Sequence, residues 1–222
     1  MAVAGEKGTQ KRINQIFVME RLLLFIKHRL GFVWYIIEAV NNSLFGLIYG
    51  SRLKRTLPGV FTDFSREPYQ YRELSVADAG KLRRLIGEQP GSDLVYFKPH
   101  AFDEDSILRQ TKKVSFLMMG VFSDDAMVGY FFLRFFSNRK CFVGRLIDKK
   151  YRGKGIGTVM NNIMYETAWR MNFRCLSTIS RNNDAVMRAH SGNRHMVILK
   201  ELNNDYLLVE FLPSENKADK LT

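Results

Sequence analysis

Three glycines within six residues constrain the fold of this chain more than any other feature. The sequence Arg-Gly-Lys-Gly-Ile-Gly occupies residues 152–157, after an apolar, β-prone run at 141–147 and before apolar side chains at helical spacing in 157–171. A turn between a strand and a helix can aim successive backbone N–H groups into one concavity, where the helix N-terminus adds about half a positive charge. The turn is therefore predicted to bind a pyrophosphate, and tight turning for steric reasons alone is the alternative.

The order of these glycines excludes the two commonest nucleotide-binding motifs. A dinucleotide-binding domain needs G-x-G-x-x-G early in a repeated parallel βαβ chain, and a Walker loop needs G-x-x-x-x-G-K-[ST]. The surrounding patterns instead predict one strand–helix–strand crossover among antiparallel hairpins: strands at 71–74, 114–122, 127–136, 141–147, 175–179, 196–202 and 206–212, and helices at 75–89, 103–110, 157–171 and 183–191. This order predicts an α/β fold of the α+β kind, with a mixed sheet of about six or seven strands flanked by helices.

Two segments resemble the cofactor motifs of the GNAT N-acetyltransferase superfamily. Residues 147–157, Ile-Asp-Lys-Lys-Tyr-Arg-Gly-Lys-Gly-Ile-Gly, resemble the acetyl-CoA motif R/Q-x-x-G-x-G/A, entered from an apolar strand and followed by an amphipathic helix. Residues 183–190, Asn-Asp-Ala-Val-Met-Arg-Ala-His, look like the second cofactor segment of that family. The resemblance covers about residues 71–212 and implies an acyl-CoA acyltransferase fold whose sheet splays between its fourth and fifth strands.

The resemblance also implies a set of cofactor-binding residues. Acetyl-CoA would be the acyl donor, with its pantetheine arm on backbone groups near the end of the fourth strand and its pyrophosphate on the amides of the glycine turn. The residues implied are Leu146, Ile147, Lys149, Arg152, Gly153, Lys154, Gly155, Ile156, Gly157 and Asn183.

Acetyl transfer to a primary amine needs a proton acceptor for the ammonium, a group that polarises the carbonyl and a proton donor for the departing thiolate. The family commonly has a Tyr seven residues beyond the cofactor Asn, as the acid at sulfur, and here that position is His190. An imidazole can perform this role. The alternative is that His190 packs the short helix and the thiolate leaves without a dedicated acid.

The proton acceptor is less clearly marked. Many relatives place a Glu on the fourth strand, but residues 141–147 contain no carboxylate and offer Arg145 instead. Asp148 at the end of this strand and His100 in the loop 97–100 are the alternatives, together with a water chain to solvent. Arg145 is a candidate for binding an anionic group of the substrate, such as a sugar-linked phosphate, or for solvating a sheet edge.

The chain begins with a basic, apolar element. Residues 1–60 carry six of the twelve excess positive charges, and apolar side chains recur at steps of three and four from 23 to 47. Charged residues interrupt this stretch before about 18 uncharged residues accumulate, so it is not expected to span a bilayer. Residues 15–55 are expected to pack on the rest of the chain, to self-associate or to lie on an anionic membrane.

Pro58, Gly59 and Pro68 predict a boundary. The expected organisation is a helical N-terminal element at 1–60, a linker at 61–70, an acetyltransferase domain at 71–212 and a loose tail at 213–222. Two cysteines without paired spacing, and no secretory signal at the start, are expected to mean buried thiols, no structural metal and a cytoplasmic protein. A peripheral location at the inner face of the membrane is the alternative that the basic, apolar element leaves open.

Taken together, these features predict an acetyl-CoA-dependent N-acetyltransferase that acts on a small-molecule primary amine, with amino sugars as the first candidates. The alternative is a non-catalytic acyl-CoA sensor or interaction module, because no carboxylate stands on the fourth strand. A net charge of +12 is compatible with nucleic acid, but no zinc-finger spacing or RNA-binding aromatic signature is present, so no nucleic-acid partner is expected.

Overall fold

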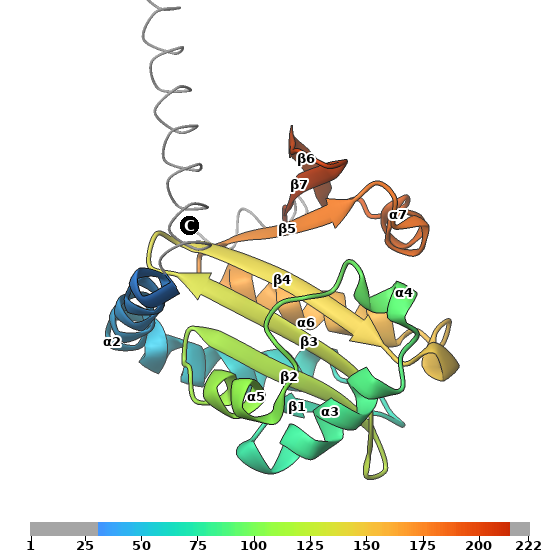
Figure 1. The fold of residues 1–222 in the computed structure, drawn as a ribbon, viewed down its shortest axis with the longest axis horizontal. Coiled ribbons are helices and arrows are strands. Elements are labelled where there is room, and N and C mark those ends of the chain that lie inside the picture. The colour runs from blue at the N-terminus through green and yellow to red at the C-terminus, as the bar shows by residue number, and fades with distance from the viewer. Residues whose placement is uncertain (1–30, 214–222) are drawn as a thin grey trace, which may run out of the picture. The chain divides into compact units, whose positions relative to one another are not determined.

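The computed structural model describes residues 31–213 and contains one seven-stranded sheet with helices on both faces (Figure 1). The elements in chain order are α2 (Gly31–Phe64), β1 (Gln70–Glu73), η1 (Val76–Asp78), α3 (Ala79–Gly87), α4 (Gly91–Leu94), α5 (Glu104–Thr111), β2 (Phe116–Ser123), β3 (Ala126–Phe136), β4 (Lys140–Ile147), η2 (Lys149–Tyr151), α6 (Ile156–Arg170), β5 (Arg174–Ser180), α7 (Asp184–His190), β6 (Met196–Glu201) and β7 (Tyr206–Phe211).

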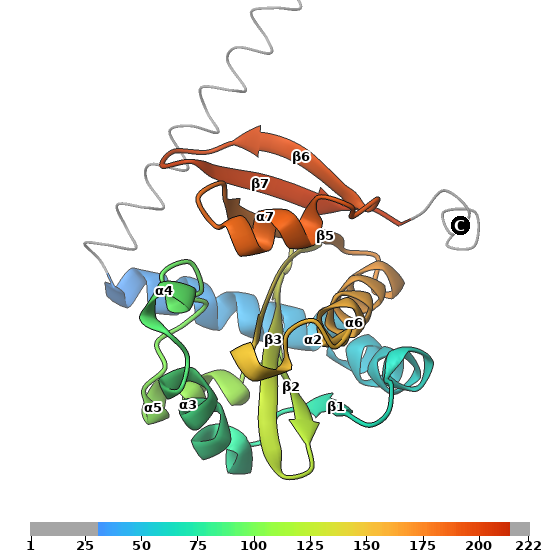
Figure 2. The same ribbon diagram turned by 90° about the vertical axis from the view of Figure 1, so that its right-hand side faces the viewer.

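The strand order is β1-β2-β3-β4-β5-β7-β6, and every neighbouring pair is antiparallel except β4 and β5. Helix α6 forms the crossover between these two parallel strands, as the sequence pattern predicted. Figure 2 shows α6 on one side of β2 and β3, with α3 and α5 on the other side. The predicted mixed sheet flanked by helices is therefore confirmed.

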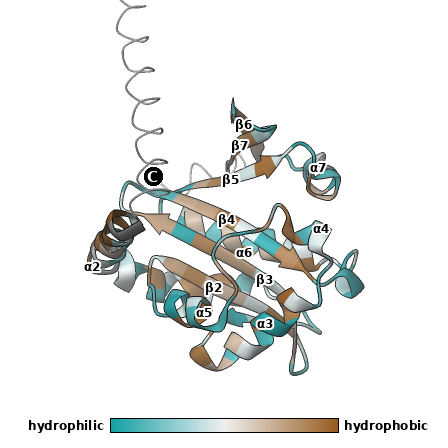
Figure 3. Ribbon diagram, in the orientation of Figure 1, coloured by the Kyte–Doolittle hydropathy of each residue, from teal (hydrophilic) through white to brown (hydrophobic). Residues whose placement is uncertain are grey.

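Strands β2 and β3 are apolar along most of their length because both of their faces are covered (Figure 3). On β3, Phe131, Leu133 and Phe135 pack into the core beneath α6, whereas Tyr130 and Phe132 pack into a second core beneath α3 and α5. This alternation follows from the two-residue period of a strand. Both layers around β3 and β4 are therefore fixed by packing.

Helix α2 differs from its prediction. The helix was expected to end near Pro58, but it continues to Phe64, with Pro58 inside it. An internal proline costs about 3 kcal/mol. The neighbouring Leu53, Leu57 and Val60 are buried in the core, and burial of side chains of this size stabilises by about 1.5–3 kcal/mol each, which offsets that cost.

The chain divides into two compact units after Ser43, which is earlier than the predicted linker at 61–70. Within the second unit, Phe45 of α2 lies in the core and stacks on Phe135 at a centroid distance of 4.8 Å. Packing on the chain's own domain therefore accounts for this face of the predicted apolar element.

The opposite face of α2 in this unit carries the exposed side chains of Leu44, Leu47 and Ile48. Self-association or contact with an anionic membrane through residues 15–55 stays a prediction, and residues 15–30 lie outside the described part of the chain. Among residues 31–213, no helix combines the length and apolar character needed to cross a bilayer.

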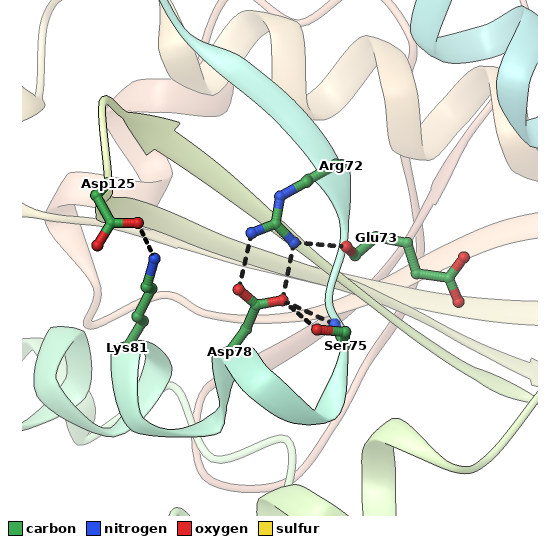
Figure 4. A network of polar contacts seen from close by, with 6 residues as sticks. All are labelled: Arg72, Glu73, Ser75, Asp78, Lys81 and Asp125. Carbon is green, nitrogen blue, oxygen red and sulfur yellow. Dashed lines mark hydrogen bonds and ion pairs between the residues drawn. The ribbon is translucent and has the colours of Figure 1, made fainter.

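An ion pair fixes the start of α3 to the edge strand β1 (Figure 4). Both Nη atoms of Arg72 donate to Asp78 at 2.8 Å, and the backbone N–H and hydroxyl of Ser75 donate to the same carboxylate at 2.8 and 2.9 Å. The hydrogen bonds from Arg72 lower the pKa of Asp78 and raise that of Arg72 itself. This buried carboxylate therefore has a full set of donors.

Candidate functional site

Strands β4 and β5 pair over only three residues. The parallel pairing ends at Phe142 and Leu176, and one further bond, from the Ser177 hydroxyl to the Val143 carbonyl at 3.0 Å, links the strands beyond it. Figure 1 shows β4 and β5 diverging toward their C-terminal ends. We call this region, residues 143–147 of β4 and 177–180 of β5, the β4–β5 split.

The glycine turn follows β4 directly and leads into α6. Gly153 and Gly155 adopt positive φ angles of 77° and 79°, which disfavour any residue with a side chain, and Gly155 is the N-cap of α6. The amides of Thr158 and Val159 return to the Gly155 carbonyl at 3.0 and 3.3 Å. Among the described residues, no acceptor is found for the amides of 153–157.

This turn fits a phosphate group. A Cβ placed on Gly153 or Gly155 would meet no atom within 4 Å, so the space beside both glycines is open. Several unpaired amides at a helix N-terminus favour an anion. The residues predicted to bind the pyrophosphate, including Ile156 and Gly157 in the first turn of α6, are therefore brought together.

The basic side chains of the turn have protein partners. Arg152 donates to the Ile147 carbonyl at 3.2 Å and pairs with Asp93 of α4 at 2.6 Å. Lys154 lies over the ring of Tyr151, with its Nζ 4.6 Å from the centroid. The turn is thus positively charged, but part of the Arg152 charge is neutralised by α4.

The backbone of β4 presents donors to the split. The Val143 carbonyl accepts a bond from β5, and backbone groups of alternate residues point to the same side of a strand, so Arg145 and Ile147 also direct their amides toward the split. Leu146 pairs with Tyr130 of β3, and its side chain is buried beneath α3 and α5. Its predicted backbone contact with a pantetheine arm is therefore disfavoured, whereas Lys149 is exposed in η2, just before the turn.

Helix α7 brings the second predicted segment to the split. Asn183 caps this helix through a bond from the Val186 amide at 3.2 Å. His190 at its C-terminus is buried, with 9% of its surface exposed, and its ring lies 5.4 Å from that of Phe211. Asn193 places one amide nitrogen 3.2 Å from His190 Nδ1 and 3.3 Å from the Tyr165 hydroxyl.

These contacts define the protonation state of His190. The Asn193 Oδ1 accepts a bond from the His195 amide at 3.1 Å, so its nitrogen must donate to His190 Nδ1, and the proton of the neutral ring lies on Nε2. Burial and the nearby charge of Arg145 lower the pKa of His190 to about 4. The imidazole is therefore neutral near pH 7 and offers an Nε2–H donor.

Arg145 points toward α6. Its Nε donates to the Asn161 Oδ1 at 2.7 Å, and its Cζ lies 3.4 Å from the position that a Cβ on Gly157 would occupy. Burial lowers the pKa of Arg145. The side chain therefore lies beside the glycine turn, and the predicted contact with an anionic acceptor substrate has no support in this geometry.

The two other predicted catalytic residues lie apart from His190. His100 contacts the Ala101 carbonyl through Nδ1 at 2.6 Å and the hydroxyl of Tyr130 through Nε2 at 2.9 Å. Nδ1 must donate to the carbonyl, so Nε2 accepts a hydrogen bond from Tyr130. Burial lowers the pKa of His100 below its ordinary value. With both nitrogens engaged, His100 is a poor proton acceptor for a substrate.

Asp148 remains available at the end of β4. Its Oδ1 accepts a bond from the Lys150 amide at 2.9 Å, which caps η2. Its second carboxylate oxygen has no hydrogen-bond partner among residues 31–213. The part-exposed carboxylate thus lies between the split and the glycine turn in the chain.

Sequence reasoning missed three polar residues near the split: Asn161, Tyr165 and Asn193. Together with Arg145 and His190 they form what we call the polar cluster. Gly157, Asn161 and Tyr165 follow one another at intervals of four, so they share one face of α6. This polar stripe within an apolar helix was a signal that pointed to the split.

Other chemistry is weakly represented. The described residues 31–213 contain no group of three or more His, Cys, Asp or Glu able to hold a metal ion. Cys141 and Cys175 are free and buried, and burial raises the pKa of both thiols well above the usual value. They are therefore packing residues rather than nucleophiles.

No family model and no curated protein sequence matches this chain. Solved structures match it well. The PaiA N-acetyltransferase from Thermoplasma acidophilum, in complex with coenzyme A, has a TM-score of 0.57 at 16% identity, over 65% of this chain and 99% of its own. The GNAT domain of PAT from S. lividans has a TM-score of 0.54 at 13% identity, over 64% of this chain and 89% of its own.

A third match is the ribosomal-protein-S5-alanine acetyltransferase from Vibrio fischeri, with a TM-score of 0.53 at 16% identity, over 68% of this chain and 97% of its own. The chain therefore has the fold of the GNAT acetyltransferases, as the glycine motif predicted. The neighbours cover about two thirds of the chain, and identities this low establish the fold alone.

Proposed function

We propose that this protein is an acetyl-CoA-dependent N-acetyltransferase that acetylates a primary amine. The observation that carries the proposal is the row of amides at 153–157, which have no acceptor within residues 31–213 and start at the open space beside Gly153 and Gly155, at the N-terminus of α6. A structural neighbour with this fold was solved with coenzyme A, which supports the choice of ligand. Acetyl-CoA supplies an acetyl group activated as a thioester.

In this proposal, the turn holds the pyrophosphate and β4 orients the acyl end. The amides of 153–157 and the charge of Lys154 bind phosphate oxygens. The amides of Arg145 and Ile147, which face the split, are placed to donate to neutral groups, and a donor near Ile147 polarises a carbonyl without any particular side chain. Asn183 contributes mainly by fixing the start of α7.

Proton transfer in this proposal does not use His190 as a cationic acid. With a pKa near 4, the ring carries no second proton at neutral pH, and its Nε2–H acts as a hydrogen-bond donor instead. Asp148 or a water chain accepts the proton of the ammonium group. With His190 as a neutral donor and Asp148 or water as the proton acceptor, the departing sulfur has no strongly acidic group beside it in this proposal.

The acceptor is proposed to be a small primary amine, with amino sugars tested first. The printed name of the Vibrio fischeri neighbour gives a protein alanine as its acceptor, so a peptide N-terminus belongs in the same panel. On the α3 and α5 side of β4, Gly144 lies under aromatic rings: its Cβ would approach Phe132 at 2.7 Å and Phe97 at 3.5 Å. A substrate on this face would therefore meet aromatic surface.

The test is acetyl-CoA binding to the natural protein and to Gly155→Glu. Ligand at about 100 times its dissociation constant should stabilise the fold by roughly 2.7 kcal/mol, seen as a raised melting temperature. Gly155→Glu should abolish this rise by placing a carboxylate and a strained φ in the turn. Gly80→Glu on α3, where a Cβ also meets nothing within 4 Å, is the matched control and should respond normally. No rise with the natural sequence would refute the proposal.

A second candidate is a non-catalytic acyl-CoA sensor. It is favoured by one observation, that β4 carries no carboxylate and the polar cluster contains none. Turnover of acetyl-CoA with amino sugars, polyamines and peptide N-termini separates the two candidates. Binding without turnover for any amine would favour the sensor.

A further inference from the structure

Arg145 is placed where β4 has lost its partner strand. The last β4–β5 pair is Phe142 with Leu176, and Arg145 lies three residues further on, within the β4–β5 split. Its side chain turns toward α6, where the guanidinium lies beside Gly157 and Asn161. A positive charge is therefore held where the two parallel strands separate.

This charge has no counter-ion within residues 31–213. The acceptor of the Arg145 Nε–H is the neutral amide oxygen of Asn161, and no carboxylate pairs with the guanidinium in the described part of the chain. Three arginines that pair with carboxylates, Arg72, Arg170 and Arg174, have raised pKa values, whereas burial lowers the pKa of Arg145. A partly buried cation without an anion is costly, so the arrangement indicates an anion that arrives with a ligand.

The groups around Arg145 offer donors rather than anions. Its charge acts on Tyr165 of α6, where it opposes the larger effect of burial, and on His190 of α7, where it adds to burial in lowering the pKa. Burial raises the pKa of Tyr165 well above its usual value, and the thiol of Cys175 on β5, the other titratable group near it, is likewise neutral. Tyr165 and His190, the two described titratable groups on which the charge of Arg145 acts, are therefore uncharged at neutral pH.

The position of Arg145 selects the part of the ligand that it meets. The guanidinium lies beside the phosphate-binding turn, at Gly157, and its charge also acts on His190 at the C-terminus of α7. A pantetheine arm that runs from the turn along the split has neutral amides. Its sulfur is the one group of that arm that becomes an anion during acyl transfer.

We propose that Arg145 is a further catalytic residue whose fixed positive charge, held by Asn161, stabilises the sulfur of coenzyme A as a thiolate. This inference rests on the proposed function. In the transfer, the amine nitrogen bonds to the acyl carbon as the carbon–sulfur bond breaks, and the sulfur keeps the electron pair of that bond. The amine proton goes to Asp148 or water, and the thiolate is later protonated by solvent.

The charge takes the place of a dedicated acid. His190 is neutral and Tyr165 holds its proton tightly, so neither is a strong proton donor at neutral pH. A cation within contact distance of sulfur achieves the same end by lowering the free energy of the thiolate itself. Loss of the charge is therefore expected to lower kcat by about tenfold to a hundredfold.

The test measures the thiol of bound coenzyme A without any turnover. The ultraviolet absorbance of the thiolate is followed against pH for coenzyme A saturating the natural protein. The thiol pKa should be about two units lower than that of free coenzyme A. The thiol pKa should return to the free value in Arg145→Gln. It should stay low in Arg145→Lys, which keeps the positive charge, even where this variant folds less well or binds coenzyme A more weakly.

Two controls define the result. Arg109→Gln removes an exposed arginine of α5 that bonds only to Ser106 among the described residues, and it should leave the thiol pKa lowered. Binding of an analogue with hydrogen in place of the thiol should be equal for the natural protein and Arg145→Gln. All three variants, Arg145→Gln, Arg145→Lys and Arg109→Gln, are first checked for native melting behaviour.

Four outcomes would overturn the inference. An unshifted thiol pKa in the natural protein, or equal shifts in Arg145→Gln and the natural protein, would show that the charge does not act on sulfur. Equal weakening of coenzyme A and the analogue lacking sulfur by Arg145→Gln would assign the charge to the phosphates. A preference for succinyl-CoA over acetyl-CoA that Arg145→Gln removes would assign it to an acyl carboxylate. Failure of the natural protein to bind coenzyme A would instead refute the proposed function.

Discussion

Arg72 and Arg145 are partly buried arginines on strands of the same sheet, and their surroundings differ. Arg72 meets a carboxylate that accepts four hydrogen bonds, two from the guanidinium and two from Ser75, and its Cζ lies 4.0 Å from the centre of the Phe122 ring. Arg145 meets one neutral amide oxygen. The first site is complete within the protein, whereas the second contains a charge that the protein alone does not balance.

This difference separates a structural ion pair from a candidate functional cation. A buried carboxylate with a full set of donors is costly to disturb, because removal of either partner leaves an uncompensated charge. A buried cation with a neutral partner is already uncompensated in the folded state, so its removal does not create that cost. Arg72 should therefore matter to stability and Arg145 to ligand chemistry.

Asp78→Ala is expected to have the largest effect. It leaves Arg72 without its carboxylate and removes the cap at the start of η1, which should lower the free energy of unfolding by about 3 kcal/mol. Chemical denaturation at pH 7 measures this change. A loss below about 1 kcal/mol would remove the distinction drawn between the two arginines.

The contributions of His190 and Asp78 to the free energy of unfolding should be lost at different pH values. His190 has a folded pKa of about 4 against an ordinary value of 6.5, so the unfolded chain takes up this proton first as the pH falls. The free energy of unfolding is then unaffected above pH 6.5 and falls by roughly 2 to 3 kcal/mol between pH 6.5 and 4. His190→Gln should flatten this part of the curve.

The contribution of Asp78 has the same sign but a lower window. Its pKa is lowered by Arg72, so its stabilisation is complete above its ordinary value of 3.8 and is lost as the pH falls below it. His100 also has a lowered pKa and therefore also destabilises the fold as the pH falls below 6.5, but it does so equally in the natural chain and in His190→Gln. The difference between these two proteins therefore isolates the contribution of His190. Parallel curves for the two proteins between pH 6.5 and 4 would contradict the assignment.

The paired substitution Arg145→Leu with Asn161→Leu should raise stability slightly. Replacing a buried polar pair by apolar residues of similar volume is often neutral or stabilising, and a gain of about 1 kcal/mol is expected because no partner charge is left behind. Thermal unfolding without ligand measures it. A loss larger than about 1 kcal/mol would identify Arg145 as a structural residue like Arg72.

Lys81→Gln should have the smallest effect. Lys81 pairs with Asp125, which is almost fully exposed, beside the Arg72 site (Figure 4). Exposed ion pairs contribute little, so the free energy of unfolding should change by less than about 0.5 kcal/mol. A larger change would mean that the two ion pairs of Figure 4 act as one network.

Much of this fold could be predicted because its signals are local. The glycine turn, the apolar strands and the helical period of α6 each lie within about twenty residues, and all three are confirmed. The continuation of α2 through Pro58 could not be predicted, because it depends on packing of Leu53, Leu57 and Val60 against strands far away in the sequence. Local breaking signals are overridden where buried area is large enough.

The cofactor turn could be predicted better than the catalytic groups. Its amides are fixed by backbone conformation, which glycine spacing reports directly. The roles of His100 and His190 depend instead on which nitrogen meets which partner: Tyr130 comes from a strand thirty residues further on, and Asn193 is positioned by the turn after α7 and its bonds to Tyr165 and His195. Sequence alone gave no measure of the burial that lowers the pKa of His190.

The short pairing between β4 and β5 also has a consequence for local unfolding. Strands β5–β7 are joined to β4 by three backbone pairs and the Ser177 bond. They also contact α6, for example through the bond from the Trp169 indole to the Phe211 carbonyl at 3.0 Å. A segment joined by few bonds opens as a cooperative unit at a lower free energy than the whole fold. Amide hydrogens in β5 and β7 should thus exchange before those of β2 and β3, and a ligand bound to both α6 and α7 would slow that exchange by fastening the two halves of the sheet together.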